Sequence, residues 1–133
     1  MRLTMPDHSA AVRAFHEAIG MELPDTPQLP SLAVQALRQT LLQEEYTELQ
    51  AAVNAGDLVA IAQEAADLLY VTYGLCLTYG IDLNPVFAEV HRANLAKTTG
   101  PRRADGKQLK PADWQPPDVA SVLAQQAPPF RDA

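Results

Sequence analysis

The sequence predicts an all-α protein with a four-helix-type bundle and an irregular C-terminal arm. Apolar residues recur at helical spacing through the middle of the chain, capping residues flank these stretches, and no stretch shows the period-two alternation of strands. A chain of 133 residues, 47% of them hydrophobic, is long enough to enclose one core. We expect a single domain over residues 1–133, with a helical core over about 7–97 and the arm over about 98–133.

Helices are expected at about 7–19, 31–54, 57–80 and 84–97, with a shorter one at 118–126. Ser31 and Asp57 suit N-caps, because their side-chain oxygens accept hydrogen bonds from the first helical turn. Asn84 precedes Pro85, and proline is favoured at the first helical position, so Asn84 is the expected N-cap of the fourth helix. Glycine, which readily closes a helix, follows the first three segments at Gly20, Gly56 and Gly80.

Prolines mark the segments that connect or follow the helices. Pro24, Pro27 and Pro30 predict an extended connector between the first and second helices. From Thr98 onward glycine and proline recur, which predicts a largely extended arm. Such an arm needs a surface to lie on, either its own bundle or that of a partner subunit. Trp114 is expected to pin it there.

Charge and cysteine content disfavour several classes of function. A formal net charge of −6 argues against nucleic-acid binding through a broad basic face. Cys76 is the only cysteine, which leaves neither a disulfide framework nor a cysteine-rich zinc site. No apolar run approaches the roughly 18 residues of a membrane span, and Pro6, Asp7 and His8 stand where a signal peptide would be apolar. We therefore expect a cytoplasmic protein that does not bind membranes.

Acidic and basic side chains occupy different parts of the sequence. Residues 39–91 contain no lysine or arginine, although they carry eight aspartates and glutamates. Six of the ten basic residues then fall between Arg92 and Lys110. This segregation predicts an acidic site faced by a basic arm.

Four carboxylates interrupt the apolar faces of the second and third helices. At 100° per residue, Glu45 and Glu48 fall within the apolar stripe of the second helix. Glu64 lies in the middle of the apolar face of the third helix, and Asp67 lies at its edge. Each pair has i, i+3 spacing, so its side chains project together. Two antiparallel helices would direct all four at one point.

A bound divalent cation is the simplest compensation for these charges. Unpaired ionised carboxylates between helices would cost several kcal/mol each, and Arg38 is the only basic residue on the two helices. Oxygen ligands favour Mg²⁺ or Mn²⁺, and magnesium sites of this kind are completed by water and substrate phosphates. The Glu-x-x-His motif of di-iron bundles is absent from both helices. The alternative is that the helices pack differently and expose the four groups.

The spacing Glu45-x-x-Glu48 and Glu64-x-x-Asp67 resembles the metal-binding motif of the all-α nucleoside triphosphate pyrophosphohydrolases, the MazG-like superfamily. The stretches LLQEEYTELQAAV and IAQEAADLLYVTYGLCLTYGIDL look like the two metal-binding helices of that superfamily. The stretch VFAEVHRANLAKTTGPRRADGKQLKP is similar to the segment that follows in one of its branches. The resemblance covers about residues 32–114.

This resemblance implies about four core helices in a dimer or a dimer of dimers. It implies that Glu45, Glu48, Glu64 and Asp67 bind Mg²⁺, with Mn²⁺ as a possible substitute. It further implies hydrolysis of the α–β phosphoanhydride of a nucleoside triphosphate, dUTP in the most similar branch, in nucleotide-pool housecleaning. Two alternatives stay open: a phosphoribosyl-ATP pyrophosphohydrolase of histidine synthesis, and a non-catalytic metal- or nucleotide-binding helical module.

The expected mechanism uses a water molecule as the nucleophile. Mg²⁺ would orient the triphosphate and lower the pKa of that water, and a nearby carboxylate would accept its proton. Glu44, at the edge of the apolar stripe, is a candidate for this general base. Glu45 is the other candidate, and it would also ligate the metal.

Substrate contacts are expected from the basic segment and from aromatic side chains. Lys97 suits a phosphate as a point charge, and Asn94, three residues earlier, suits the base or the sugar. Phe15 and Tyr70 are candidates for an aromatic slot around the base. Further candidates for phosphate binding are Arg102, Arg103, Lys107 and Lys110.

Overall fold

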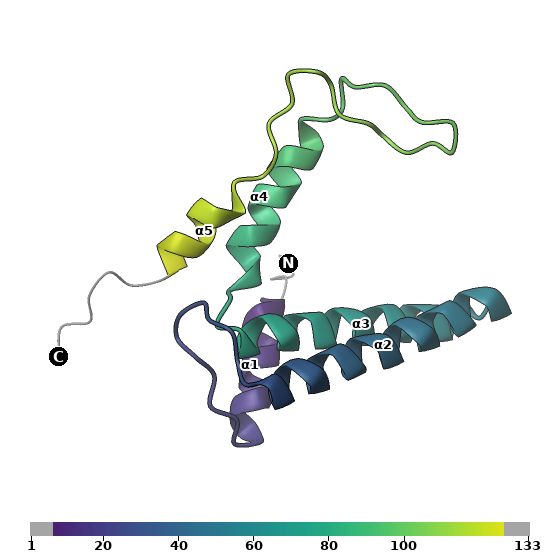
Figure 1. Cartoon of the computed structure of the whole chain (residues 1–133). Coiled ribbons are helices and arrows are strands. Elements are labelled where there is room, and N and C mark those ends of the chain that lie inside the picture. The colour runs from purple at the N-terminus through teal and green to yellow at the C-terminus, as the bar shows by residue number, and fades with distance from the viewer. Residues whose placement is uncertain (1–6, 127–133) are drawn as a thin grey trace, which may run out of the picture. The chain divides into compact units, whose positions relative to one another are not determined.

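A computed structural model describes residues 7–126, and within them the chain forms helices and no strand (Figure 1). The helices are α1 (His8–Ala18), α2 (Leu32–Ala55), α3 (Leu58–Thr78), α4 (Leu83–Leu95) and α5 (Val119–Gln126). The prediction of an all-α fold is confirmed. The ends of the expected domain, residues 1–6 with Pro6 and residues 127–133, lie outside the described residues.

The predicted caps of α2 and α3 are confirmed. The Ser31 hydroxyl accepts a hydrogen bond from the Val34 amide at 3.3 Å. The Asp57 carboxylate accepts one from the Ala60 amide at 3.1 Å. Between these helices Gly56 has a φ of 67°, the left-handed conformation that lets the chain turn back at once.

The predicted start of α4 was wrong by two residues. The helix begins at Leu83, and its N-cap is Asp82, which accepts a hydrogen bond from the Asn84 amide at 3.1 Å. Pro85 therefore stands in the first turn rather than at its first position. Amides of the first turn have no partner within the helix, so a proline is tolerated there as well. The helix also ends at Leu95, slightly earlier than expected.

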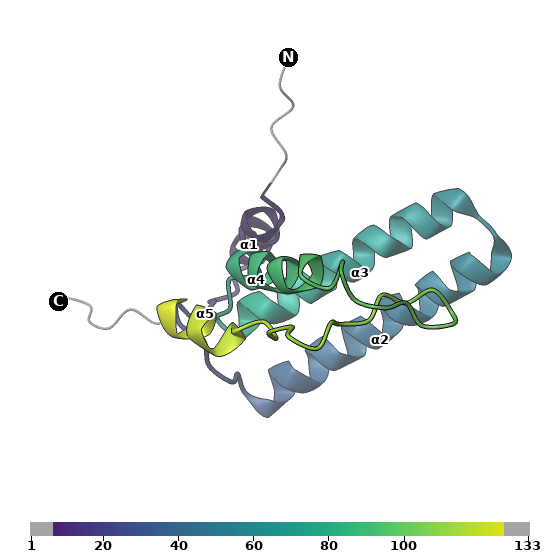
Figure 2. The same cartoon turned by 90° about the horizontal axis from the view of Figure 1, so that it is seen from above.

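The chain divides into two compact units, residues 1–81 and 82–133, which we describe separately. In the first unit, α2 and α3 run antiparallel and side by side as a long hairpin, and α1 packs on α3 (Figures 1 and 2). The connector that precedes α2 returns to the end of α3, where the Gln28 amide donates to the Tyr79 carbonyl at 2.9 Å. A β-carbon on Gly80 would lie only 2.0 Å from the Thr26 carbonyl oxygen, so glycine permits this approach.

The core of the first unit is small. Val12 and Leu77 are each 2% exposed. Two polar side chains, His16 and Arg38, are also buried in this unit. Several large apolar side chains remain exposed, most strongly Leu29, Leu32, Leu58 and Val59. None of the described helices has the length and apolar character required to cross a membrane.

In the second unit, the arm after α4 is irregular, and side-chain hydrogen bonds hold it to α4 and to the residues that follow α4. The side-chain amide of Gln108 donates to the carbonyls of Lys97 at 2.8 Å and Gly100 at 2.6 Å. The Trp114 indole N–H donates to the Ala93 carbonyl of α4 at 2.6 Å. Farther along, the Gln126 side chain pairs with both backbone groups of Asp82, which fixes α5 to the start of α4.

Candidate metal centre

The seam between α2 and α3 determines which side chains meet. Seam residues on each helix are spaced alternately four and three apart, as in an antiparallel coiled coil. On α2 they are Val34, Arg38, Leu41, Glu45, Glu48 and Ala52, and on α3 they are Ala60, Glu64, Asp67, Val71, Gly74 and Thr78. The observed partners follow this register: Arg38 lies against Gly74, and Glu48 interacts with Glu64. The seam therefore brings acidic pairs together near its centre.

Three glutamates converge at this place. Glu45, Glu48 and Glu64 each offer a carboxylate oxygen, and these oxygens lie within 4.8 Å of one another. Glu45 and Glu64 are half-buried, whereas Glu48 is exposed. Asp67, the fourth predicted ligand, lies outside this group of three, but its negative charge acts on both Glu45 and Glu64.

The close approach of these carboxylates raises their pKa values. The pKa of Glu64 rises to about 7, chiefly because its protonated form hydrogen-bonds to Glu48, and further because of burial and the charges of Glu48 and Asp67. The pKa of Glu45 is also raised, mainly by burial and then by the charge of Glu48. In the absence of a cation, the folded chain therefore resists full ionisation of the cluster.

The residues present fit a hard divalent cation. Oε2 of Glu45 and Oε2 of Glu64 are shielded from solvent and have no hydrogen-bond partner. Buried oxygens without a partner are costly, and a metal ion would satisfy both. Oxygens bound to one Mg²⁺ at about 2.1 Å lie roughly 3–4 Å apart, so the cluster needs only a small contraction. The acidic cluster is thus compatible with a divalent metal.

Glu44, the other predicted catalytic residue, is exposed on α2 beside the seam. It does not belong to the group of three converging glutamates. Its role as a general base stays a prediction, and Glu45 is the candidate that the seam places within the cluster.

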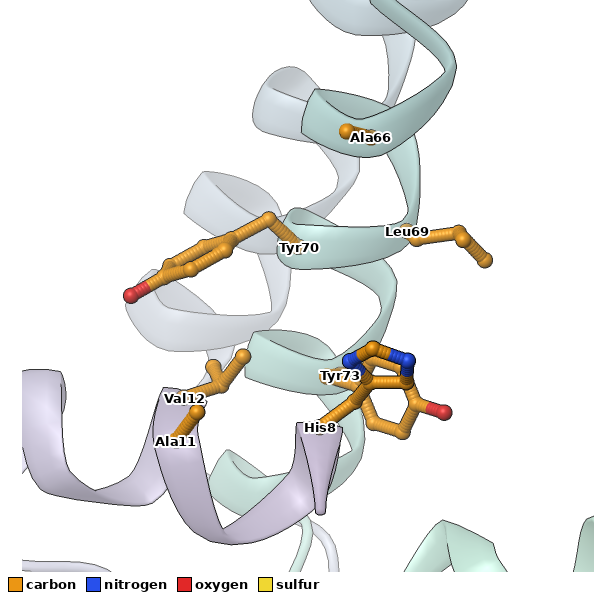
Figure 3. Close-up of a pocket in the computed structure, with 7 residues that line it drawn as sticks. All are labelled: His8, Ala11, Val12, Ala66, Leu69, Tyr70 and Tyr73. Atoms are coloured by element: carbon orange, nitrogen blue, oxygen red, sulfur yellow. The ribbon is translucent and has the colours of Figure 1, made fainter. Parts of the chain in front are cut away.

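The aromatic candidates lie around a separate apolar cavity of about 180 Å³ between α1 and α3. Figure 3 shows Tyr70, Leu69 and Tyr73 of α3 beside the α1 residues that complete this cavity. Tyr70 contributes to the lining, and Phe15 meets its ring edge-on with centroids 5.8 Å apart. Leu69 and Tyr73 fall about 140–180° around α3 from Glu64. The cavity therefore opens away from the carboxylates, and Tyr70 lies at its border.

The predicted contacts to the phosphates, together with Asn94, the predicted contact to the base or sugar, all lie in the second unit. Asn94 is exposed on α4, and Lys97 follows the end of that helix half-buried. Arg103 is held by the Asp105 carboxylate at 2.6 Å, and Arg102 contacts the Gln108 side chain at 3.4 Å. In contrast, one cavity is lined by all three lysines of the sequence: Lys97, Lys107 and Lys110.

Arg38 is a notable residue to which the sequence analysis assigned no site. It is 5% exposed, its Nε has no hydrogen-bond partner, and its Nη2 lies 3.5 Å from the Met21 sulfur. Burial lowers the pKa of this guanidinium. The alternating four-and-three spacing that places Arg38 on the seam was the signal that could have identified it.

The fold and the cluster define a class: all-helical proteins in which a helical hairpin presents glutamates suited to a divalent cation. A sequence model of the phosphoribosyl-ATP pyrophosphohydrolase family matches residues 12–94. The chain belongs to that family, and with it to the MazG-like all-α nucleoside triphosphate pyrophosphohydrolases. No curated protein matches the chain.

The family match favours one of the two substrates considered from the sequence. It names phosphoribosyl-ATP, which was the alternative, and gives no support to dUTP. The family agrees with the expectation from the sequence on two points: the activity is that of a pyrophosphohydrolase, and the substrate is of nucleotide type.

Proposed function

We propose that this protein hydrolyses the α–β phosphoanhydride of a nucleoside triphosphate group and releases pyrophosphate, with Mg²⁺ held by the glutamates of the α2–α3 hairpin. The observation that carries the proposal is the convergence of Glu45, Glu48 and Glu64, with two solvent-shielded oxygens that lack a partner. Membership of a pyrophosphohydrolase family supports the same chemistry.

Each carboxylate has a distinct part in this proposal. Glu45 and Glu64 hold the cation from the inner side of the seam, and the exposed Glu48 holds it at the edge that substrate can reach. Asp67 adds a further negative charge and is the proposed fourth ligand. When bound, Mg²⁺ supplies neutralisation of the triphosphate and acidification of the attacking water. Glu45, or Glu44 beside it, accepts the proton of that water.

Phosphoribosyl-ATP is the leading substrate candidate, because the family model that matches the chain bears this name. Competition between phosphoribosyl-ATP and dUTP in one reaction measures the ratio of their kcat/KM values directly. Preference for phosphoribosyl-ATP supports the candidate. Faster cleavage of dUTP would replace it while leaving the proposed chemistry intact.

The proposed activity is tested by measuring pyrophosphate release with Mg²⁺ or Mn²⁺ over canonical and non-canonical nucleotides. Glu48→Gln and Glu64→Gln should lower kcat/KM by more than the roughly 10–100-fold that changes behind metal ligands cost. Glu17→Gln, which alters an exposed ion pair on α1, is the matched control. Full activity in both seam variants would refute the site, and metal binding without hydrolysis of any nucleotide would favour the non-catalytic module.

We also propose a cytoplasmic homodimer or dimer of dimers. The large apolar side chains left exposed on the first unit support self-association, since monomers rarely leave large apolar patches uncovered. Sedimentation velocity at micromolar concentration distinguishes these assemblies from a monomer.

A further inference from the structure

We propose that Lys97, Lys107 and Lys110, arranged around Trp114, form a binding site for a diphosphate group. The choice of diphosphate rests on the proposed function, in which water cleaves the α–β phosphoanhydride and pyrophosphate is released. The basic site itself rests on the second unit alone and does not require the metal centre.

The first observation is a cavity of about 230 Å³ with an unusual concentration of positive charge. Its lining consists of Lys97, Lys107, Gln108, Leu109, Lys110 and Trp114. Among residues 7–126, no carboxylate forms an ion pair with any of these three lysines. An anion that enters the cavity therefore has no internal acidic group to displace.

Two arginines of the same segment differ in this respect. Arg92 is paired with Glu89, and Arg103 is paired with Asp105. Their charges are compensated within the chain, so they are weaker candidates for an external anion than the lysines. The structure thus pairs two arginines with carboxylates and places Arg102 on the Gln108 side chain, whereas the three lysines share one cavity.

Trp114 brings two of the lysines together. The Lys97 ammonium lies 5.2 Å from the centroid of the indole ring, and the Lys110 ammonium lies 5.4 Å from it. Each cation is attracted to the ring, whereas the two cations repel each other. An anion bound in the cavity that both lysines line would offset that repulsion. Because both ammonium groups occupy positions over the indole, the ring is poorly available for stacking on a nucleobase.

Trp114 and the arm that carries it are fixed to the rest of the second unit. The Trp114 indole N–H is anchored on the Ala93 carbonyl, and Gln108 ties the arm to the end of α4. The chain at Gly100 approaches Leu109 so closely that a β-carbon would lie 2.1 Å from the Leu109 carbonyl oxygen. Lys107 and Lys110 flank this tied segment, so their backbone positions are set before a ligand arrives.

The charges favour a ligand with more than one phosphoryl group. Lysine ammonium groups act as point charges that suit phosphoryl oxygens without demanding a planar, bidentate partner. Three of them around one cavity can engage both halves of a diphosphate, whereas a single phosphoryl group would leave part of the charge uncompensated. Free pyrophosphate and the β,γ-phosphates of a nucleotide share this chemistry.

Trp114 is the only tryptophan of the chain and reports on its own site. The full chain is titrated with inorganic pyrophosphate in EDTA, so that no metal ion can recruit the anion to the carboxylates. We expect a saturable change in tryptophan fluorescence. Lys97→Gln and Lys110→Gln should each weaken binding by about tenfold, the effect of losing one charge-assisted hydrogen bond. Arg13→Gln, which removes one positive charge from α1, should change the Kd less than twofold.

Two further ligands distinguish the sources of the diphosphate. A nucleoside triphosphate with a methylene bridge between its α and β phosphorus atoms should bind about as tightly as pyrophosphate, if the site holds the β,γ-phosphates of substrate. Binding of pyrophosphate alone would assign the site to the product. A nucleoside monophosphate should bind at least about tenfold more weakly than pyrophosphate in either case.

Substitutions of Trp114 distinguish its role in positioning the lysines from a role in packing alone. By calorimetry, Trp114→Phe should retain pyrophosphate affinity better than Trp114→Leu, because only phenylalanine preserves an aromatic face for the lysines. Equal affinity of the lysine variants and wild type would overturn the proposal, as would an equal loss in Arg13→Gln. These measurements involve no turnover, so the absence of hydrolysis would refute the proposed function without touching this site.

Discussion

Arg38 of α2 lies against Gly74 of α3 so closely that a β-carbon on the glycine would fall 3.0 Å from Nη1 of the guanidinium. His16 of α1 borders the same space, with Cε1 at 3.1 Å from that position. Arg38 and His16 are 5% and 3% exposed, and His16 donates from Nδ1 to the Val12 carbonyl at 2.8 Å. The three helices of the first unit therefore pack tightly against one another at Gly74.

Gly74→Ala should destabilise the protein despite the better helix propensity of alanine. The added methyl group has to displace two buried side chains, which costs about 1–3 kcal/mol, and the propensity gain recovers only about 1 kcal/mol. We expect a net loss of up to about 2 kcal/mol in the free energy of unfolding, measured by urea denaturation.

The same substitution should cost less when Arg38 is replaced. In an Arg38→Met background the guanidinium that crowds the added methyl group is gone and only the His16 contact remains, so Gly74→Ala should destabilise the protein less than it does in the wild type. An equal loss of stability in both backgrounds would show that the crowding comes from elsewhere.

Two glycines with nearly the same backbone conformation should respond differently to alanine. Gly56 and Gly80 have φ values of 67° and 69°. A β-carbon on Gly56 meets nothing within 4 Å, so Gly56→Ala should cost only the roughly 1–2 kcal/mol of the left-handed conformation. A β-carbon on Gly80 would collide with the Thr26 carbonyl at 2.0 Å. Gly80→Ala should therefore lower the melting temperature clearly more, and equal shifts would contradict the packing of the connector.

The stability of the metal-free protein should fall as the pH rises. The pKa of Glu64 is raised to about 7 in the folded chain from the ordinary 4.5. Between these values the folded state retains a proton that the unfolded state releases, so stability is greatest below the window and is lost as the pH rises through it. Urea midpoints in EDTA at pH 5.5 and pH 8 measure this difference. Glu64→Gln should flatten it, and Glu17→Gln should not.

Magnesium should oppose this loss of stability. A cation that binds only the folded cluster stabilises it by about 1.4 kcal/mol when its concentration is ten times its Kd. At pH 8 the melting temperature of the wild type should rise with Mg²⁺ and return to its initial value with EDTA. The Glu48→Gln variant should show a much smaller rise, and a full rise in that variant would place the cation elsewhere.

Local chemistry explains why so much of the first unit could be predicted from the sequence. Ser31 and Asp57 form caps with amides three residues away, and the turn between α2 and α3 is set by Gly56. The convergence of Glu45 and Glu64 follows from helical periodicity once the turn is short. The start of α4 was misplaced because Asp82 and Asn84 are both good caps, and proline is tolerated throughout a first turn.

Features that depend on contacts between distant residues could not be predicted in the same way. The seam position of Arg38 is visible in the spacing, but its proximity to Gly74 depends on the register of two helices. The cations on Trp114 come from Lys97 and Lys110, which are joined by an arm whose path depends on Gln108. The name of the matching family is what favours phosphoribosyl-ATP over dUTP as the candidate substrate, and no single residue could have indicated that preference.

The short turn between α2 and α3 also has a consequence for the order of assembly. The converging glutamates lie within residues 45–64, so their meeting requires closure of one hairpin and none of the sequence that follows. Contacts between residues close in the chain form rapidly, because little loop entropy opposes them. We expect the acidic cluster to assemble during synthesis, before the lysine-rich arm has been translated. Under that sequence of events, the nascent hairpin is the first part of the protein able to capture a divalent ion.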